Sequence, residues 1–532
     1  MAEQAAPHGD LVTAVVSVGR TIDAAVQRVP DRAALIVGGR RCTYRDLEGE
    51  TRRVAAALAA HGVGPGDRVA LVDDGSVLSV ATILAAARLG AASAQMNVQL
   101  TPDELGKLAA AVGARVGVAG ERYLGRLAGA VDVVIGESDL GEGDLDDRPP
   151  RPDGPDEPDG TGDDDEALVL FTSGTTGLPK PISISHGVVG QRLAFYGAPI
   201  DPGEPPATDM MSVPIFHIGG TLGLLISLYA GHELVVLPRF DAGEWLRAVE
   251  EHRVSQTFVV PTMLQRILDH PDLGSRDLSS LRQLSYGAAA APVALVERAL
   301  DALPEVGFVN TFGQTETLGA YAALSPDDHR RRHKLGSAGR PLPGVEVRIV
   351  DPAGGGDGEG QAIGEVGEVW VRAAQNVTRD WLHTGDLAFV DDEGYLHPVG
   401  RLADTINRGG EKFGPIEVEE ALRAHPAVRD VGVAGVPDAE LGQRVGAVVV
   451  LAAAEPPASE PSTAEPPTTG SPTAAELRAF CAERLARYKL PDWIVFAADL
   501  PYSNLGKVSR TALAEVIAEA LREGRADDAV HA

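Results

Sequence analysis

Two spacings of apolar residues alternate along the N-terminal part of the chain. Apolar residues at helical spacing mark 51–61 and 77–89, whereas short apolar runs at 68–72 and 91–96 are typical of buried strands. The alternation resumes after residue 166, with strands expected at 167–171, 232–237 and 257–260 and helices at 187–195 and 241–252. Helices and strands in this order predict a doubly wound α/β sheet.

Three segments of biased composition interrupt this pattern. Residues 141–166 are rich in Asp, Glu, Pro and Gly, residues 351–361 in Gly, and residues 454–474 in Pro, Ser, Thr and Glu. We expect the first to be a solvated loop, the second to be a hairpin turn between β segments, and the third to be an insertion in the last domain.

The pattern changes again near residues 399–404. Beyond this point the spacing predicts a small α+β unit, with helices at 418–425 and 473–486 and strands at 428–436 and 444–451. We therefore expect an N-terminal domain at 1–400, a hinge at 401–405 and a C-terminal domain at 406–532.

Charge and cysteine usage exclude several classes of function. The 532 residues include 47 Lys and Arg against 76 Asp and Glu, a net charge of −29, which disfavours nucleic acid and anionic membranes as partners. Cys42 and Cys481 lie too far apart to indicate a disulfide framework or zinc site, and the N-terminus lacks the features of a signal peptide. We expect a cytoplasmic protein.

The longest apolar stretch, 221–237, contains Gly, His and Glu, so we expect no membrane span. The oligomeric state stays open.

The strongest chemical signal is the segment FTSGTTGLPKP at 171–181. An apolar strand leads into a loop whose backbone N–H groups and hydroxyls can surround an anion, with the Lys180 ammonium beside them. The loop is not a Walker A motif, because Leu178 stands where that motif has its lysine. A plain polar turn is the alternative, and the residues flanking SGTTG favour the anion site.

This loop resembles the phosphate-binding signature of the adenylate-forming enzymes, which include acyl-CoA ligases, adenylation domains and luciferases. Further motifs of that superfamily follow in order, namely PIFHIG at 214–219, SYGAAAAP at 285–292, TFGQTE at 311–316, TGD at 384–386, GRLADTINRGGEKFGPIEVE at 400–419 and PYSNLGK at 501–507. The resemblance covers roughly residues 20–520 and is closest to acyl-CoA ligases. It implies an N-terminal domain of two doubly wound subdomains and a small β-barrel, hinged to a small α+β domain.

The resemblance also implies a two-step reaction. A carboxylic acid and ATP would give acyl-AMP and pyrophosphate, with Mg²⁺ as cofactor, and the thiol of CoA would then displace AMP. Transfer to a carrier-protein pantetheine, adenylation alone, a non-catalytic binder and a luciferase-like oxygenase stay open as alternatives. The alanines at 288–291 leave room for a bulky or natural-product acid, whose identity stays open.

Residue roles follow from the matched motifs. Lys507 would bridge the carboxylate and the α-phosphate, Thr315 would contact the α-phosphate and Glu316 would bind Mg²⁺. The nucleotide would be bound by Thr172, Ser173, Gly174, Thr175, Thr176, Gly177, Lys180, Gly287, Ala288, Ala289, Asn310, Thr311, Phe312, Gly313, Asp386 and Arg401. The acid pocket would be lined by His217, Tyr286, Leu318 and Gly319, the thiol channel by Gly409, Gly410 and Glu411, and the hinge would be Ala403. His217 would also be catalytic, because the residue at this point can respond to thiol binding. His217 also fits a packed core residue, and the charged residues also fit solvated turns.

Three positions depart from the superfamily pattern. The segment 376–381 is shorter than the corresponding loop of the superfamily, which precedes the TGD motif and lies beside the nucleotide site. Ala403 replaces the usual Asp or Lys of the hinge, and Pro181 replaces the usual Gly after Lys180. The first two departures motivate the alternative that the chain stops at the adenylate or passes the acyl group to a carrier-protein pantetheine.

Overall fold

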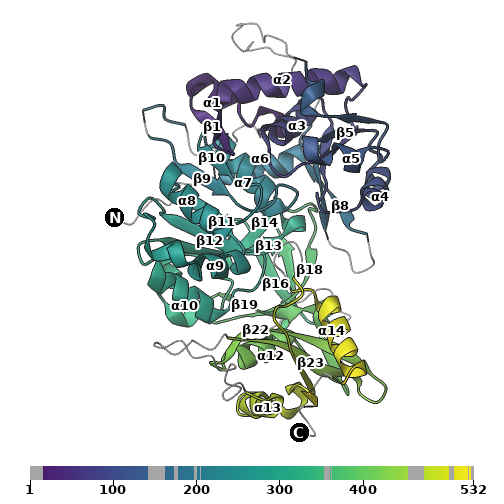
Figure 1. The fold of residues 1–532 in the computed structure, drawn as a ribbon, viewed down its shortest axis with the longest axis vertical. Helices are drawn as coiled ribbons and strands as arrows, with labels where there is room; N and C mark the ends of the chain where they lie inside the picture. Colours follow the sequence, from purple (N-terminus) through teal and green to yellow (C-terminus); the bar gives the residue numbers. More distant parts are fainter. Residues whose placement is uncertain are drawn as a thin grey trace, which may run out of the picture.

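The computed structural model describes residues 16–141, 162–172, 178–196, 200–203, 205–352, 360, 362–452, 472–502, 508–524 and 527–528. Figure 1 shows three tiers along the longest axis. The N-terminal elements lie at the top, the sheet that contains β11, β12 and β13 lies in the middle, and the C-terminal unit with β22 and β23 lies at the bottom.

The first sheet has six strands in the order β6-β5-β3-β4-β7-β8. Five of them run parallel, namely β3 (Arg68–Val72), β4 (Ala92–Gln95), β5 (Val116–Ala119), β6 (Val133–Ile135) and β7 (Glu166–Thr172). The edge strand β8 (Lys180–Ser185) is antiparallel to β7 and pairs Pro181 with Phe171. An edge strand tolerates proline because one side of it makes no ladder hydrogen bonds.

The second sheet has nine strands in the order β15-β14-β13-β12-β11-β9-β10-β1-β2. Its six central strands are parallel, and β14, β15 and β2 at its edges are antiparallel. The bounds are β1 (Ala33–Val37), β2 (Arg40–Thr43), β9 (Thr208–Met211), β10 (Glu233–Val236), β11 (Gln256–Val259), β12 (Gln283–Gly287), β13 (Gly307–Gln314), β14 (Gly319–Leu324) and β15 (Arg340–Pro341).

Helices cover both faces of the two sheets. One core joins the sheets through α2 (Tyr44–Ala60), α3 (Val77–Arg88), α6 (His186–Tyr196) and α7 (Ile218–Tyr229). A second core lies under α8 (Ala242–His252), α9 (Pro261–Leu268) and α10 (Val293–Ala302), and a third under α4 (Pro102–Val112) and α5 (Leu124–Leu127). The short α1 (Asp23–Arg28) packs with the first core. The expected pair of doubly wound subdomains is confirmed.

A third sheet follows, in the order β16-β17-β18-β19. Its strands are antiparallel and comprise β16 (Glu346–Val350), β17 (Gly367–Arg372), β18 (Leu382–Val390) and β19 (Leu396–Arg401). The antiparallel β16–β17 pair fits the β segments expected on either side of the 351–361 turn, of which 353–359 and 361 lie outside the described residues. The expected small β-barrel is instead an open sheet in the described residues, with β16 and β19 at opposite edges, because four strands are too few to close around a core.

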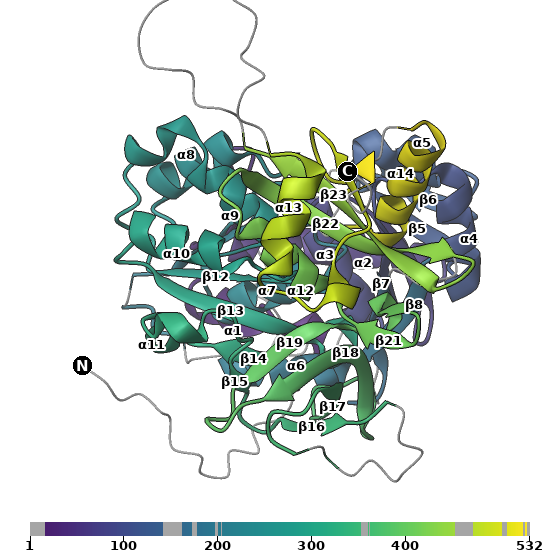
Figure 2. The ribbon, with the colours of Figure 1, turned by 90° about the horizontal axis from the view of Figure 1, so that it is seen from below.

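The C-terminal unit is α+β, as expected. Its sheet runs β21-β20-β23-β24-β25, with β22 added on β23, and α12, α13 and α14 pack on it (Figure 2). The bounds are β20 (Ile406–Arg408), β21 (Glu411–Phe413), α12 (Pro415–Arg423), β22 (Val428–Asp438), β23 (Gly442–Leu451), α13 (Ala474–Ala482), β24 (Trp493–Phe496), α14 (Arg510–Arg522) and β25 (Asp527–Asp528). Most of the segments expected as a loop and an insertion, 142–161 and 453–471, lie outside the described residues.

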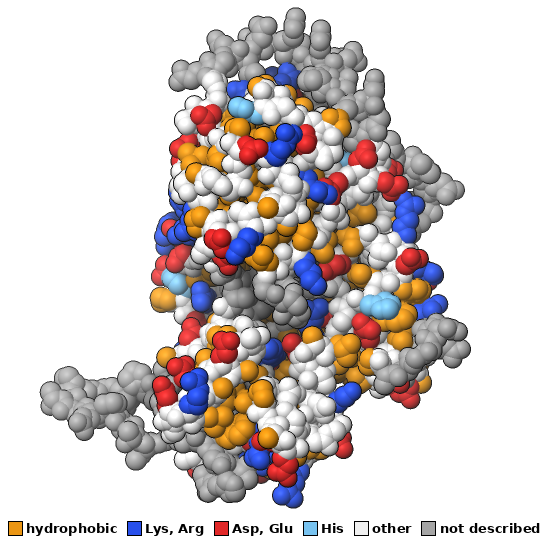
Figure 3. Space-filling model, turned by 90° about the vertical axis from the view of Figure 1, so that its right-hand side faces the viewer, with side chains coloured by type: hydrophobic (Ala, Val, Ile, Leu, Met, Phe, Trp, Pro, Cys, Tyr) orange, Lys and Arg blue, Asp and Glu red, His pale blue; other side chains and the backbone are white. Residues whose placement is uncertain are grey.

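Two surface properties bear on partners. On the face drawn in Figure 3, acidic, basic and hydrophobic side chains of the described residues are interspersed. Within the described ranges, each helix is too short or too polar to cross a membrane.

Candidate active site

The carboxyl ends of β12 and β13 form one wall of the candidate site. Gly287 pairs with Thr311, and the two backbones are so close that a Cβ on Gly287 would lie 2.2 Å from the Thr311 carbonyl oxygen. The chain then turns at Ala288, which has φ +65° and is exposed. Ligands of open α/β sheets bind at such strand ends. The structure thus brings the Gly287–Ala289 and Thr311–Gly313 segments together.

A tight turn carries the predicted catalytic Thr315 and Glu316. The Gln314 N–H donates to Thr317 Oγ1 at 3.0 Å, and Gln314 Nε2 donates to the Thr384 carbonyl at 3.5 Å. Glu316 is half-buried. These contacts place the turn of β13 directly against the TGD segment of the third sheet.

The shortened segment 376–381 lies on this same turn. The Val377 N–H donates to the Glu316 carbonyl at 3.0 Å. Asn376 is 3% exposed, and its Nδ2 donates to the Val371 carbonyl at 3.0 Å, which anchors the segment on β17. A short connection therefore supports the backbone of Glu316 directly.

Asp386 and Arg401 face each other across β18 and β19. Arg401 Nε donates to Asp386 Oδ1 at 2.9 Å, and Arg401 Nη2 donates to the Thr384 carbonyl at 3.1 Å. The Asp386 side chain is 13% exposed, so part of its carboxylate stays accessible to a ligand. Burial and then the Asp386 charge raise the pKa of Tyr321, a buried residue of β14. Asp386 therefore lies where the second and third sheets meet.

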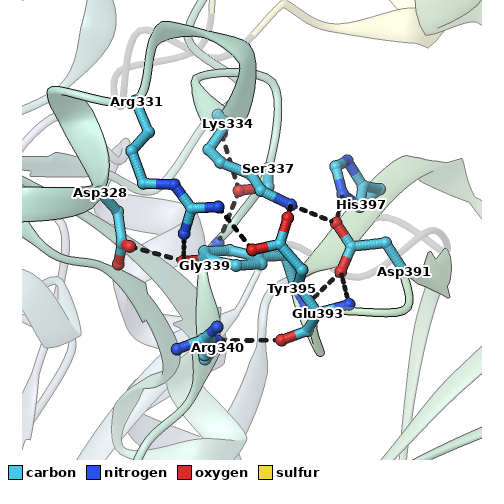
Figure 4. Close-up of polar contacts among 10 residues, drawn as sticks. All are labelled: Asp328, Arg331, Lys334, Ser337, Gly339, Arg340, Asp391, Glu393, Tyr395 and His397. Atoms are coloured by element: carbon cyan, nitrogen blue, oxygen red, sulfur yellow. Dashed lines mark hydrogen bonds and ion pairs between the residues drawn. The ribbon is translucent and has the colours of Figure 1, made fainter.

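An ion-pair cluster holds these two sheets together, and Figure 4 shows its contacts. The Lys334 side chain is 6% exposed, and its Nζ lies 2.8 Å from Asp391 Oδ2 and 2.7 Å from Glu393 Oε1, both on the turn between β18 and β19. His397 Nε2 also lies 3.0 Å from Asp391 Oδ2. Hydrogen bonds from Arg331 and Lys334 lower the pKa of Glu393 to about 2. The cluster fixes the strands that carry Asp386 and Arg401.

Helix α7 and the start of β14 form the region predicted to bind the acid. His217 is the N-cap of α7 and is half-buried, with its ring 4.6 Å from that of Phe216. A Cβ on Gly319 would lie 3.1 Å from Leu222 Cδ2 of α7. Leu318 has φ +46° and is buried in the core between the two sheets.

Two of the residues predicted to line the acid pocket, Tyr286 and Leu318, are buried in the cores of this structure. Tyr286 is fully buried in the second core, under α8 to α10, and its hydroxyl lies 2.9 Å from His329 Nε2. Leu318 lies in the other core. Successive side chains of a strand point to opposite faces, so the neighbours of Tyr286 on β12 face the other side of the sheet.

The C-terminal unit presents the predicted thiol-channel residues on a hairpin. Gly409 (φ +62°) and Gly410 (φ +96°) form the exposed turn between β20 and β21, and the Gly409 N–H donates to the Leu441 carbonyl at 2.8 Å. Arg408 anchors the hairpin, because its Nη2 donates at 2.5 Å to Asp492, which is 1% exposed. Ala403 is exposed in the 3-10 turn Leu402–Asp404, between the third sheet and this unit.

Comparison with known proteins identifies the family. Residues 22–381 match the AMP-binding enzyme family, and residues 417–507 match the AMP-binding enzyme C-terminal domain. The chain belongs to the AMP-binding enzymes. It is an AMP-forming acid–thiol ligase of the acyl-CoA synthetase type, and it activates a carboxylic acid as the acyl-AMP before forming the CoA thioester.

Three relatives illustrate the similarity. A feruloyl-CoA synthase from an Amycolatopsis species is 36% identical over 496 residues, which cover 90% of this chain and 94% of that protein. A long-chain-fatty-acid–CoA ligase from Mycobacterium tuberculosis is 31% identical over 494 residues, covering 89% and 93%. The o-succinylbenzoate CoA synthetase of Bacillus subtilis, solved with its acyl-adenylate, is 28% identical with a TM-score of 0.77, covering 93% and 97%. The same synthetase has been solved with ATP and magnesium.

Part of the predicted site of this AMP-binding enzyme lies outside the described residues. Lys507 and the loop residues Ser173, Gly174, Thr175, Thr176 and Gly177 belong to that part. The ends of both loops are described, since Thr172 pairs with Lys180 and Tyr502 forms a β-bridge with Val508.

Magnesium fits the donors that the site offers. In the described ranges, no group of three His, Cys, Asp or Glu side chains could hold a metal. Mg²⁺ commonly binds one or two carboxylates together with substrate phosphates. A single half-buried carboxylate, that of Glu316, suits an ion that arrives with a nucleotide.

Sequence reasoning missed the supporting cluster and one buried cation. Lys334 is one of only six lysines in the chain, and that rarity is the signal that could have singled it out. Arg192 lies inside a predicted helix and carried no signal, because its surroundings come from a strand 128 residues further along the chain.

Proposed function

We propose that both half-reactions of this AMP-binding enzyme occur at the junction of the second and third sheets. In the first, a carboxylate oxygen of the acid bonds to the α-phosphorus of ATP and pyrophosphate leaves. In the second, the sulfur of CoA bonds to the acyl carbon, the thiol proton is released and AMP leaves. The contact between Gln314, which precedes the Thr315–Thr317 turn, and the strand that carries Asp386, the partner of Arg401, supports this location most strongly.

Asp386 is proposed to bind the ribose. Its carboxylate can accept hydrogen bonds from both ribose hydroxyls while Arg401 holds it in position. Gly287, Ala288, Ala289 and Phe312 are proposed to border the adenine, at the ends of β12 and β13. Asn310, Thr311 and Gly313 belong to the same strand end, and the Asn310 Nδ2 donates to the Ser337 carbonyl at 3.3 Å.

The phosphates are proposed to lie between the 172–180 loop and Thr315. Glu316 would hold Mg²⁺, which neutralises phosphate charge when bound. Lys507 would add a positive charge between the carboxylate and the α-phosphate. Two anions must meet in this step, so the cations and N–H donors lower the barrier by compensating their repulsion.

The second half-reaction is proposed to use rotation about the segment 401–405, with Ala403 as the pivot between domains 1–400 and 406–532. Rotation would exchange Lys507 for the Gly409–Glu411 hairpin at the acyl-adenylate. Hinged domains of this kind can present two groups to one site in turn. We propose that the reaction takes place in the cytoplasm.

The acid is proposed to resemble the substrates that the relatives' names give, which are aryl, fatty and succinylbenzoic acids. Mass spectrometry of products from an acid panel with ATP and Mg²⁺, with and without CoA, tests this proposal. We expect an acyl-CoA for one acid class and its acyl-AMP when CoA is omitted. An acyl-AMP that accumulates despite CoA would contradict the second half-reaction.

A matched pair of variants tests the location of the nucleotide. Asp386→Asn weakens a charged hydrogen-bond acceptor, so the KM for ATP should rise roughly 10- to 100-fold. Asp392→Asn makes the same chemical change at an exposed aspartate of the nearby β18–β19 turn. It should leave the KM for ATP unchanged. Equal KM values for ATP in the two variants would contradict ribose binding by Asp386.

A further inference from the structure

Arg192 is a buried cation whose described contacts include no acid. The residue lies on α6 and is 3% exposed. Its Nη2 donates to the Ala320 carbonyl at 2.6 Å, and its Cζ lies 5.7 Å and 5.1 Å from the ring centres of Phe195 and Tyr196. In the described part of the chain, its Nε is buried and has no hydrogen-bond acceptor.

Three other cations of low exposure among the described residues are paired with carboxylates. Lys334, whose side chain is 6% exposed, contacts two carboxylates. Arg88, 15% exposed, contacts Glu48 and Asp23, and Arg408, 16% exposed, contacts Asp492. A buried guanidinium without a counter-charge is costly, because one carbonyl and two ring faces replace its lost hydration only in part. Burial accordingly lowers the pKa of Arg192. This cost calls for an explanation outside the core itself.

The position of the guanidinium supplies the explanation. Arg192 reaches from α6, which packs beside the first sheet, to β14 of the second. A Cβ on Gly319 would lie 3.9 Å from Arg192 Nη2 and 3.1 Å from Leu222 of α7. Gly319 follows the Thr315–Thr317 turn by two residues. The guanidinium therefore lies beside the region expected to bind the acid, on the side of α7.

We propose that Arg192 determines substrate specificity by binding an oxygen acceptor at the end of the acid remote from its reacting carboxyl group. The substrate class is therefore an acid with a distal carboxylate or phenolic oxygen. The inference rests on the proposed function. A guanidinium whose Nε lacks an acceptor among the described residues suits such oxygens, because charge-assisted hydrogen bonds are strong and directional. A site that must hydrogen-bond its substrate discriminates against the analogue lacking the acceptor, since the buried donor is then left unpaired.

Matched acids test the proposal on the unmodified enzyme. We would measure kcat/KM for pyrophosphate release with 4-hydroxycinnamic against cinnamic acid, and with octanedioic against octanoic acid. We expect the acid with the distal oxygen to be preferred by roughly 10- to 100-fold in at least one pair. A preference in the first pair identifies a phenol as the acceptor, and one in the second identifies a carboxylate. Turnover without preference in either pair would overturn this inference alone, whereas no adenylation across a broad acid panel would overturn the proposed function.

Variants then assign the preference to Arg192. Arg192→Met keeps the length of the side chain and removes the donors, so the preference should collapse while the acid without the distal oxygen is still turned over. Arg192→Lys retains the charge and should restore part of the preference, which keeps the test valid if the Met variant does not fold. Arg247→Met removes an exposed arginine of α8 and should retain the full preference. A lower unfolding temperature with an unchanged preference would show that Arg192 only joins α6 to β14.

Discussion

Gly313→Ala tests whether the glycine of the TFGQTE motif is required by the backbone. A Cβ on Gly313 would lie 1.9 Å from the Gly319 carbonyl oxygen and 2.7 Å from Ala320 Cα. Real Cβ contacts are essentially never shorter than 3.0 Å, so β14 must move by at least about 1.1 Å. That movement would displace Gly319 and the adjoining Thr315–Thr317 turn.

The expected effect has two parts. Overpacking of this kind costs about 1–3 kcal/mol of folding stability. A shift of about 1 Å in the turn that carries Thr315 and Glu316 should lower kcat/KM for ATP–pyrophosphate exchange roughly 100-fold. Exchange kinetics and thermal unfolding measure the two effects separately.

Gly223→Ala provides the matched control. Gly223 lies on an exposed face of α7, where a Cβ meets no atom within 4 Å, and its backbone is helical. Alanine there should stabilise the protein by about 0.5–1 kcal/mol and leave the exchange rate unchanged. If Gly313→Ala retains the exchange rate and unfolding temperature of the unmodified enzyme, the close-approach reasoning is refuted.

Two further predictions concern Lys507 and pH. Lys507→Ala should sharply reduce adenylation while the conversion of supplied acyl-AMP to acyl-CoA persists; equal loss of both rates would count against its proposed role. Burial lowers the pKa of His329, whose Nδ1 donates to the Ser325 carbonyl at 2.7 Å and whose Nε2 accepts from the Tyr286 hydroxyl. As the pH falls, His329 of the unfolded chain therefore takes up a proton at a higher pH than His329 of the folded chain. The stabilisation that comes from burying neutral His329 is fully present above about pH 6.5 and is lost as the pH falls through the folded-state pKa. Denaturant midpoints between pH 7.5 and pH 5 should fall less in His329→Gln than in the control His61→Gln, which changes an exposed residue; identical slopes would contradict this assignment.

Local sequence determined most of the elements and the order of the motifs. The apolar run at 68–72 is the strand β3, and the helical spacing at 77–89 is α3. Both signals depend on near neighbours, since the strand and helix periods are properties of the local backbone. The TFGQTE and TGD motifs were recognised by their resemblance to those of the adenylate-forming enzymes, and the structure brings them together through Gln314 and Thr384.

Tertiary structure alone decided which side chains face one another. Tyr286 lies in the second core, because the face of β12 on which it lies is covered by α8 to α10. Lys334 donates to Asp391, which lies 57 positions further along the sequence. Arg192 donates to the carbonyl of Ala320, which lies 128 positions further along. The local pattern predicts burial but not the partner, since the partner is set by how the sheets pack. The sequence by itself therefore determined the elements and the reaction class, whereas the packing of the sheets decided what supports the site and which cation is buried against β14.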